Sequence, residues 1–223
     1  MIQITECANC YEPVCEKRNP NLASPDCPIK RKPGIMKKGL RKSLEPELKE
    51  FARQAAIQQS EAFIRSEDGI FARYSRLEET ILFAKKMGYK RLGLAFCSAL
   101  RNESILVNKI LENHGFEVVS VCCKVGGLSG ELIGITNEDI SRGSKDYTLM
   151  CNPVTQAEIM NDEGAEFNIV IGLCVGHDSL FIKHANALST VLIAKDHVFG
   201  HNPAAVLKLS GPYCKKFMQF RKE

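Results

Sequence analysis

Hydrophobic and polar positions form two alternating patterns along the second half of the chain. Continuous apolar runs, bounded by polar residues or glycine, are typical of strands buried on both faces of a parallel sheet. Such runs occupy residues 91–97, 117–123, 168–174 and 190–195. Apolar residues at helical spacing lie between them, at residues 105–113, 153–161 and 179–187. The alternation predicts a three-layer α/β domain, with a parallel sheet of at least four strands and helices on both faces.

Two further helices are predicted upstream of this sheet. Apolar residues at helical spacing predict one long amphipathic helix over residues 43–65, with Ser43 as its N-cap. A second helix opens at Ser75, because Glu78 follows at the spacing of a capping box, and Gly88 closes it. We interpret both helices as structural.

The first segment, residues 1–34, has a different composition. Its prolines disfavour a regular helix or a central strand, and it has few apolar residues with which to fold. Its cysteines follow the spacing C-x2-C-x4-C-x11-C, at Cys7, Cys10, Cys15 and Cys27. Four thiolates favour a closed tetrahedral zinc site, whose binding free energy would fold the segment. An iron–sulfur cluster on the same thiolates, or four free thiols in a disordered leader, are the alternatives. We therefore divide the chain into a zinc lobe, 1–34, and an α/β domain with leading helices, 35–223.

A basic stretch follows this lobe. Residues 30–42 contain seven lysines and arginines and no acidic residue, in a chain whose net charge is +4. The stretch suits an anionic partner such as RNA, or a solvated linker. We favour the linker, because no aromatic residue is interleaved for base stacking, and a nucleic-acid partner is disfavoured.

Ten cysteines are a high number for 223 residues. The first residues lack the form of a signal peptide, and no apolar run approaches the ~18 residues of a membrane span. We therefore expect a cytoplasmic protein without a membrane segment, in which cysteines are thiols or metal ligands rather than disulfides. Hydrophobic residues make up 44% of the chain, enough for a real core. Cys214 stands apart, and we interpret it as a buried small hydrophobe.

Five cysteines fall at or just beyond the predicted strand ends. Ligands bind at the carboxyl ends of the strands in parallel α/β sheets, so these thiols are expected along one cleft. They are Cys97, Cys122, Cys123, Cys151 and Cys174. Only one of the adjacent pair points into the cleft, because successive strand residues face opposite ways. The sequence leaves open which of Cys122 and Cys123 it is, and we include Cys123 among the candidate site residues. Three or four converging thiolates would suit zinc or an iron–sulfur cluster.

Cys151 and Cys174 both precede predicted helices, where the helix N-terminus favours a thiolate. We therefore predict Cys174 and Cys151 as catalytic groups, with His177 as an acid or base. Asp178 is interpreted as a helix cap. The predicted cofactor-binding residues of the cleft are Cys97, Cys123, Cys151, Cys174 and His201. The alternative is that cysteines simply fill strand ends as small, buried residues.

Glycines break the strand–helix rhythm over residues 125–150. A loop of this length inside a compact domain is usually functional or mobile. We expect it to form a lid over the cleft.

Several motifs along the chain resemble one known family. They are Gly-Leu-Cys-Val-Gly-His-Asp-Ser-Leu-Phe at 172–181, Cys-Asn-Pro at 151–153, Lys-Asp at 195–196 and His-Asn-Pro at 201–203. Together with the four-cysteine leader, they resemble the uncharacterised cysteine-rich proteins that carry the domain of unknown function 1847. The resemblance implies metal binding through the N-terminal cysteines and implies no particular reaction.

Two main classes of function fit these patterns. The first is a metal-binding protein whose cleft performs thiol or iron–sulfur chemistry on a small substrate. The second is a non-enzymatic module, with zinc in the leader and a small anion held at helix ends. A nucleic-acid adaptor is a third, less favoured class. The sequence leaves open the substrate, the metal, the oligomeric state and whether the protein is an enzyme.

Overall fold

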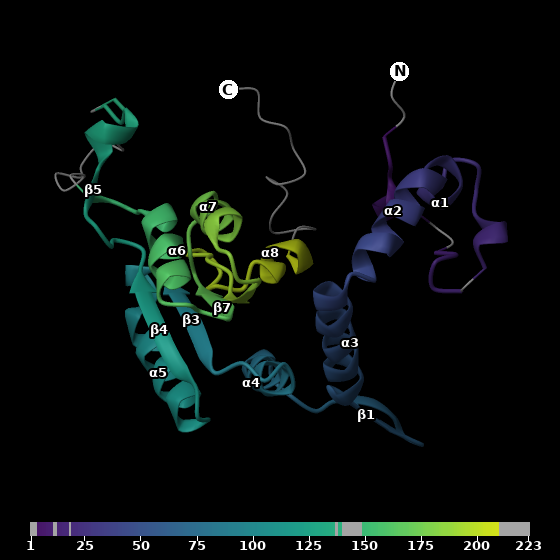
Figure 1. Ribbon diagram of the computed structural model, residues 1–223. Coiled ribbons are helices and arrows are strands. Elements are labelled where there is room, and N and C mark those ends of the chain that lie inside the picture. Colours follow the sequence, from purple (N-terminus) through teal and green to yellow (C-terminus); the bar gives the residue numbers. More distant parts are fainter. Residues whose placement is uncertain (1–3, 11–12, 18, 137, 140–148, 210–223) are drawn as a thin grey trace. The chain divides into compact units, whose positions relative to one another are not determined.

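The computed structural model describes residues 4–10, 13–17, 19–136, 138–139 and 149–209. The chain divides into two compact units, Met1–Phe63 and Ile64–Glu223 (Figure 1). The boundary predicted at residue 34 falls inside the first unit. Cys214 lies outside the described residues, so the interpretation of that residue stays a prediction.

The first unit consists of short helices, several of which begin at a proline. They are η1 (Cys7–Asn9), η2 (Pro20–Leu22), α1 (Pro28–Arg31), α2 (Pro33–Ser43) and α3 (Pro46–Glu61). Proline suits the first helical position, because its missing N–H would have no partner there anyway. The prediction of one helix over residues 43–65 is wrong, since Ser43 ends α2 and Glu45 is the N-cap of α3. The basic stretch is largely helical and mostly exposed rather than an irregular linker.

The second unit alternates strands and helices as the hydrophobic pattern predicts. Its leading elements are β1 (Phe63–Ser66), which starts at the boundary, β2 (Gly69–Ala72) and α4 (Arg76–Lys86). The main alternation is β3 (Arg91–Phe96), η3 (Ser98–Leu100), α5 (Arg101–Asn113), β4 (Glu117–Cys122), α6 (Pro153–Asp162), β7 (Phe167–Ile171), α7 (His177–His184), β8 (Ser189–Ile193) and α8 (Ala204–Lys208). The capping box of Ser75 and Glu78 at α4 is confirmed.

Four strands form one parallel sheet in the order β4-β3-β7-β8. The central strand β7 is buried along its whole length, whereas the edge strand β4 alternates between buried and more exposed residues. The chain leaves β3 toward β4 and then crosses back over β3 to reach β7. Open α/β sheets bind ligands at such a reversal, in the crevice outside the carboxyl ends of the strands, which here are those of β3 and β7.

Helices cover both faces of the sheet, as predicted. On one face, the Phe83 ring of α4 lies 5.5 Å from the Phe167 ring of β7, and α5 packs on β3 and β4. On the opposite face, α6 approaches so closely that a Cβ atom added to Gly93 would lie 2.9 Å from the Met160 sulfur. Helix α7 packs beside α6 (Figure 1). Among the described residues, no helix is long and apolar enough to cross a membrane.

The glycine-rich stretch after β4 contains regular structure that its sequence did not predict. β5 (Leu128–Ser129) pairs antiparallel with β6 (Leu149–Met150), and η4 (Gly130–Ile133) follows β5. The pairing brings the chain back to the sheet directly before Cys151. The predicted lid role stays a prediction, and residues 137 and 140–148 of the stretch lie outside the described part.

Candidate functional site

The carboxyl edge of the sheet gathers four cysteines and one lysine. Cys97 follows β3, Cys123 follows β4, Cys174 follows β7, and Lys195 follows β8. Cys151 joins them from the residue before the N-cap of α6. Because β3 and β7 flank the crevice, Cys97 and Cys174 stand on its two sides.

The sulfur atoms follow one another as a chain of contacts. The Cys151 thiol lies 3.6 Å from the Cys123 sulfur. The Cys123 thiol lies 4.0 Å from the Ser98 hydroxyl, and the Cys123 and Cys97 side chains interact. The Lys195 amine then bridges two strand ends. Its Nζ lies 2.6 Å from the Cys97 sulfur and 3.5 Å from the Cys174 sulfur. We call the four cysteines and Lys195 the thiol cluster.

Backbone hydrogen bonds fix the buried half of the thiol cluster. The Cys97 amide donates to the Ile171 carbonyl at 3.0 Å, and the Cys123 amide donates to Phe96 at 2.8 Å. These bonds extend the sheet pairing by one residue on each side of β3. The cysteines are thereby held as rigidly as strand residues, which a precise reactive site requires.

The start of η3 also faces the cluster. The Ala99 amide donates to the Cys97 sulfur, and the Ser98 amide donates to the Cys123 sulfur, each at 3.5 Å. Free N–H groups at a helix N-terminus favour negative charge nearby. Below them, the Gln156 amide donates to the Val121 carbonyl at 2.5 Å and ties α6 to the end of β4.

This environment separates the acidities of two neighbouring thiols. The pKa of Cys97 falls from its ordinary value of 9.0 to about 4. The hydrogen bond from Cys123 lowers it most, and the Lys195 amine and the Ala99 amide add to the effect, against the opposing effect of burial. The pKa of Cys123 is raised, first by the hydrogen bond it donates to Cys97 and then by burial. Cys97 is therefore the thiolate and Cys123 the thiol.

Lys195 carries the compensating charge. Burial opposes that charge, but hydrogen bonds and attraction to Cys97 and Cys174 outweigh it, so the pKa of Lys195 is raised. The loop after β8 holds the lysine in place. The Asp196 carboxylate accepts from the amides of Val198 and Phe199 at 2.9 and 3.0 Å. His201 closes the loop, with Nδ1 accepting from the Asp196 amide at 3.1 Å.

Lys195 is the functional residue that the sequence reading missed. Its position at the end of the fourth predicted strand, inside the Lys-Asp motif, was the available signal.

The predicted helix caps have mixed outcomes. Asn152 caps α6, accepting from the Thr155 amide at 3.1 Å, and Pro153 occupies the first turn as predicted. The prediction that Asp178 caps α7 is wrong. Gly176 is the N-cap, at a positive φ of 87°, and Asp178 accepts instead from the Gly176 and Ser179 amides.

Two of the described histidines, His177 and His201, were predicted as site residues. His177 begins α7, and its Nδ1 is buried without a hydrogen-bond partner among the described residues. The His201 ring lies edge-on to His197, with centroids 5.9 Å apart. The His177 amide donates to the Cys174 carbonyl at 3.0 Å, but no described hydrogen bond joins the imidazole of His177 or His201 to a cysteine sulfur. Their catalytic and ligand roles therefore stay predictions.

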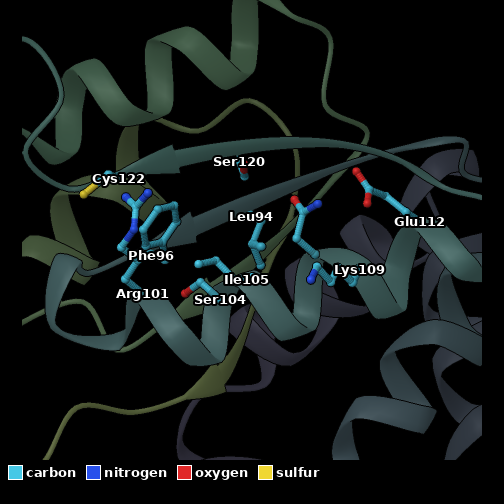
Figure 2. Close-up of a pocket in the computed structure, with 10 residues that line it drawn as sticks. Leu94, Phe96, Arg101, Ser104, Ile105, Lys109, Glu112, Ser120 and Cys122 are labelled. Carbon is cyan, nitrogen blue, oxygen red and sulfur yellow. The ribbon is translucent and has the colours of Figure 1, made fainter.

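Of the two adjacent cysteines at the end of β4, Cys123 faces the thiol cluster, which settles a question that the sequence left open. Cys122 points to the opposite face and lines a groove of about 500 Å³ between α5 and the sheet. Figure 2 shows Cys122, Phe96 and Arg101 together at one end of this groove. The groove therefore lies on the other side of the sheet from the thiols.

In the first unit, three of the four leader cysteines share one pocket. Cys7, Cys10 and Cys27 line a hollow of about 370 Å³, together with Glu6 and Asp26. Cys15 is exposed and does not line it. Among the described residues, no group of three or more histidine, cysteine, aspartate or glutamate side chains is arranged to hold a metal ion. The zinc prediction for Cys7, Cys10, Cys15 and Cys27 stays a prediction.

The iron–sulfur prediction for the thiol cluster stays a prediction, and one contact weighs against it. The Lys195 ammonium occupies hydrogen-bonding positions on two of the predicted ligands, the sulfurs of Cys97 and Cys174. A metal cation bound to these sulfurs would be repelled by the Lys195 ammonium unless the lysine side chain moved away. The charge on Cys97 is already balanced by the chain's own residues.

Comparison with known proteins agrees with the motif resemblance. Residues 27–192 match the model of a family described as "Protein of unknown function (DUF1847)". The chain is also similar to "Uncharacterized protein MJ0455" of Methanocaldococcus jannaschii, with 41% identity over 172 residues. That alignment covers 77% of this chain and 86% of the relative. Neither name states a reaction or a metal. On this evidence the protein belongs to the DUF1847 family of proteins of unknown function.

Proposed function

We propose that this protein performs thiol chemistry on a small substrate at the carboxyl edge of its sheet, with the Cys97 thiolate as the nucleophile. The observation that carries the proposal is the contact of 2.6 Å between the Lys195 amine and the Cys97 sulfur. Thiolates are the reactive form of cysteine, and enzymes stabilise them with nearby cations and helix N-termini. The thiol cluster combines both features.

The role of each group follows from its contacts. Lys195 holds a positive charge beside the nucleophile, and the Cys123 thiol supplies a proton at hydrogen-bonding distance. Cys151 and Cys174 are partly exposed, so they meet solvent first. The predicted catalytic roles of Cys174 and Cys151 thus change to supporting roles around a buried nucleophile.

The substrate is small because access to the nucleophile is narrow. Only 5% of the Cys97 surface is exposed, and Cys123 is buried beside it. A group must therefore enter the crevice between the ends of β3 and β7 to reach the sulfur. Large protein substrates do not fit this geometry.

A pH titration of the thiolate absorbance tests the proposal without depending on access. The wild-type protein should contain a thiolate at mildly acidic pH that Cys97→Ser lacks. Cys122→Ser is the matched control, since its side chain faces the groove on the other side of the sheet. Identical titrations of wild type and Cys97→Ser would refute the assignment of the nucleophile.

Metal analysis of the same preparation separates this proposal from iron–sulfur chemistry. Anaerobically purified protein should contain neither iron nor sulfide bound to the thiol cluster. Iron and sulfide that disappear in Cys97→Ser would overturn the thiolate mechanism in favour of the cluster.

We also propose that the leader binds zinc, as a second function independent of the thiol cluster. The supporting observation is that Cys7, Cys10 and Cys27 line one pocket with two carboxylate residues. Thiolate and carboxylate ligands both suit zinc. Zinc bound to the full-length protein, measured after anaerobic purification, tests this function.

A further inference from the structure

The thiol cluster places a buried pair of sulfurs next to a partly exposed third one. Cys97 and Cys123 are 5% and 1% exposed, whereas Cys151 is partly exposed. Cys123 lies 3.6 Å from the Cys151 sulfur. It also lies beside Cys97, because the adjacent amides of Ser98 and Ala99 donate to the Cys123 and Cys97 sulfurs, respectively, and the two side chains interact. Cys123 is therefore the only member of this trio placed between the other two.

We propose that Cys97, Cys123 and Cys151 form a disulfide relay that reduces low-molecular-weight disulfides. This inference deepens the proposed function and rests on it, because it needs Cys97 as the nucleophile. The disulfide would move in the order Cys97, Cys123, Cys151, which is the order in which the sulfur atoms lie next to one another.

The first step is attack of the Cys97 thiolate on a substrate disulfide, R–S–S–R. A bond forms between Cys97 and one substrate sulfur, the substrate S–S bond breaks, and R–S⁻ leaves. The proton of the Cys123 thiol passes to this leaving group and gives the first R–SH. The Lys195 ammonium stabilises the negative charge on the sulfurs while that charge passes from one sulfur to the next.

The next two steps move the disulfide outward. The Cys123 thiolate attacks the Cys97 sulfur, which forms the Cys97–Cys123 bond and expels the second R–S⁻. Cys151 then gives its proton to that group and attacks Cys123, which releases Cys97 as a thiolate. The balance is one substrate disulfide and two thiols, Cys123 and Cys151, converted into two R–SH and the Cys123–Cys151 disulfide.

The geometry favours each transfer. A disulfide bond measures about 2.05 Å, so the 3.6 Å between Cys123 and Cys151 closes by a small side-chain movement. The amides of Ser98 and Ala99 stabilise negative charge on either buried sulfur. The last disulfide includes Cys151, whose exposure allows an external thiol to reduce it. Cys174 contacts Lys195 and takes no part in the relay.

The experiment uses full-length, fully reduced protein and bis(hydroxyethyl) disulfide as the probe. The reaction is quenched with an alkylating reagent, and disulfides are assigned by peptide mass spectrometry, which also separates the leader cysteines from the relay. The wild-type protein should accumulate the Cys123–Cys151 disulfide.

Each serine variant should stop the relay at a different species. Cys151→Ser should accumulate the Cys97–Cys123 disulfide, and Cys123→Ser should retain the substrate half as a mixed disulfide on Cys97. Cys97→Ser should lose disulfide formation at Cys123. Cys122→Ser is the matched control and should behave as the wild type, since it lies on the opposite face.

Several outcomes would overturn the relay. A Cys97–Cys174 disulfide in the wild type would show that Cys174, and not Cys123, attacks the mixed disulfide on Cys97. Formation of Cys123–Cys151 in Cys97→Ser at the wild-type rate would remove Cys97 from the reaction. If the thiolate titration still assigns Cys97 while either result occurs, the proposed function stands and only the relay fails. If the titration also shows no thiolate at Cys97, the proposed function and the relay are both refuted.

Discussion

At the scale of single residues, Lys195 organises the site. Its amine reaches sulfurs that follow two different strands, so one side chain joins the ends of β3, β7 and β8. An ammonium between two sulfurs favours a thiolate on the nearer one. Water screens the attraction between the two opposite charges only weakly, because both groups are partly buried. Cys97, at 2.6 Å, is the nearer.

Replacing this lysine should make Cys97 a weaker acid. In Lys195→Met the pKa of Cys97 should rise from about 4 toward 9.0, but only part of the way, because Cys123 and Ala99 still donate to the sulfur. Thiolate absorbance against pH measures the change, and Lys195→Arg should restore part of it. Lys183→Met, exposed on α7, is the control. An unchanged titration in Lys195→Met would separate the lysine from the nucleophile.

The same thiolate makes stability depend on pH. The pKa of Cys97 is lowered by folding, so its contribution is complete above the unfolded value near 9.0 and is lost as pH falls toward about 4. Between about pH 8 and pH 5, this one group should change the free energy of unfolding by up to roughly 1.4 kcal/mol per pH unit. Cys123 and Lys195 have raised pKa values, so both keep their protons in this window.

Urea unfolding at several pH values checks this expectation. Wild-type protein should lose stability on acidification faster than Cys97→Ser, and the difference between the two curves isolates Cys97. Parallel curves would mean that Cys97 is protonated in the folded protein at these pH values.

At the scale of elements, the turn after β7 shows how tightly the backbone is fitted around the site. Gly172 has a positive φ of 59°, and a Cβ atom there would lie 2.3 Å from a methyl carbon of Leu100. Leu100 is 1% exposed, so it has no space into which to move. The Gly172 amide also donates to Ile193 of β8 at 2.8 Å. Two residues later the chain delivers Cys174.

Gly172→Ala should therefore destabilise the protein by roughly 2–4 kcal/mol, through backbone strain and overpacking together. Gly176→Ala is a matched control, since Gly176 also has a positive φ, of 87°, but nothing lies within 4 Å of its added Cβ atom. Strain alone should cost about 1 kcal/mol there. Denaturant unfolding compares the two variants, and equal losses would show that the contact with Leu100 is unimportant.

The sheet and its cysteine-bearing edge could be predicted because their signals are local. Apolar runs predicted the four strands to within a few residues. Alternation along β4 predicted that only one of Cys122 and Cys123 faces the cleft, but not which one, because both positions fit a strand end. The end of α2 at Ser43 could not be predicted, because a serine before apolar residues at helical spacing also fits an N-cap, whereas α3 starts at Pro46. The β5–β6 pair was missed because two-residue strands leave no periodicity in the sequence.

At the scale of the whole molecule, the chain carries two separate groups of cysteines in two compact units. The sequence could predict both groups from spacing and strand ends. It could not predict which sulfurs share a pocket or which contact Lys195, since these depend on side-chain positions in three dimensions. Cys15, for example, belongs to the predicted four-cysteine group but does not line the pocket that the other three share.

Substitutions of the leader cysteines should differ in their effect on zinc binding. Cys27→Ser should abolish zinc binding, since Cys27 lines the pocket with Cys7 and Cys10, whereas Cys15→Ser should retain it. Metal quantitation of the full-length variants after anaerobic purification measures this. Equal loss in both variants would instead support the four-cysteine site expected from the sequence. In each variant the Cys97 thiolate absorbance should stay unchanged.

The span of the thiol cluster along the chain has a consequence for biosynthesis. Cys97 is translated early, but Lys195 comes almost a hundred residues later, after β7 and α7. A nascent chain that still lacks Lys195 therefore holds a less acidic thiol at position 97, which only Cys123 and the Ala99 amide stabilise as a thiolate. The full reactivity of Cys97 follows only once the residues after β8 are in place.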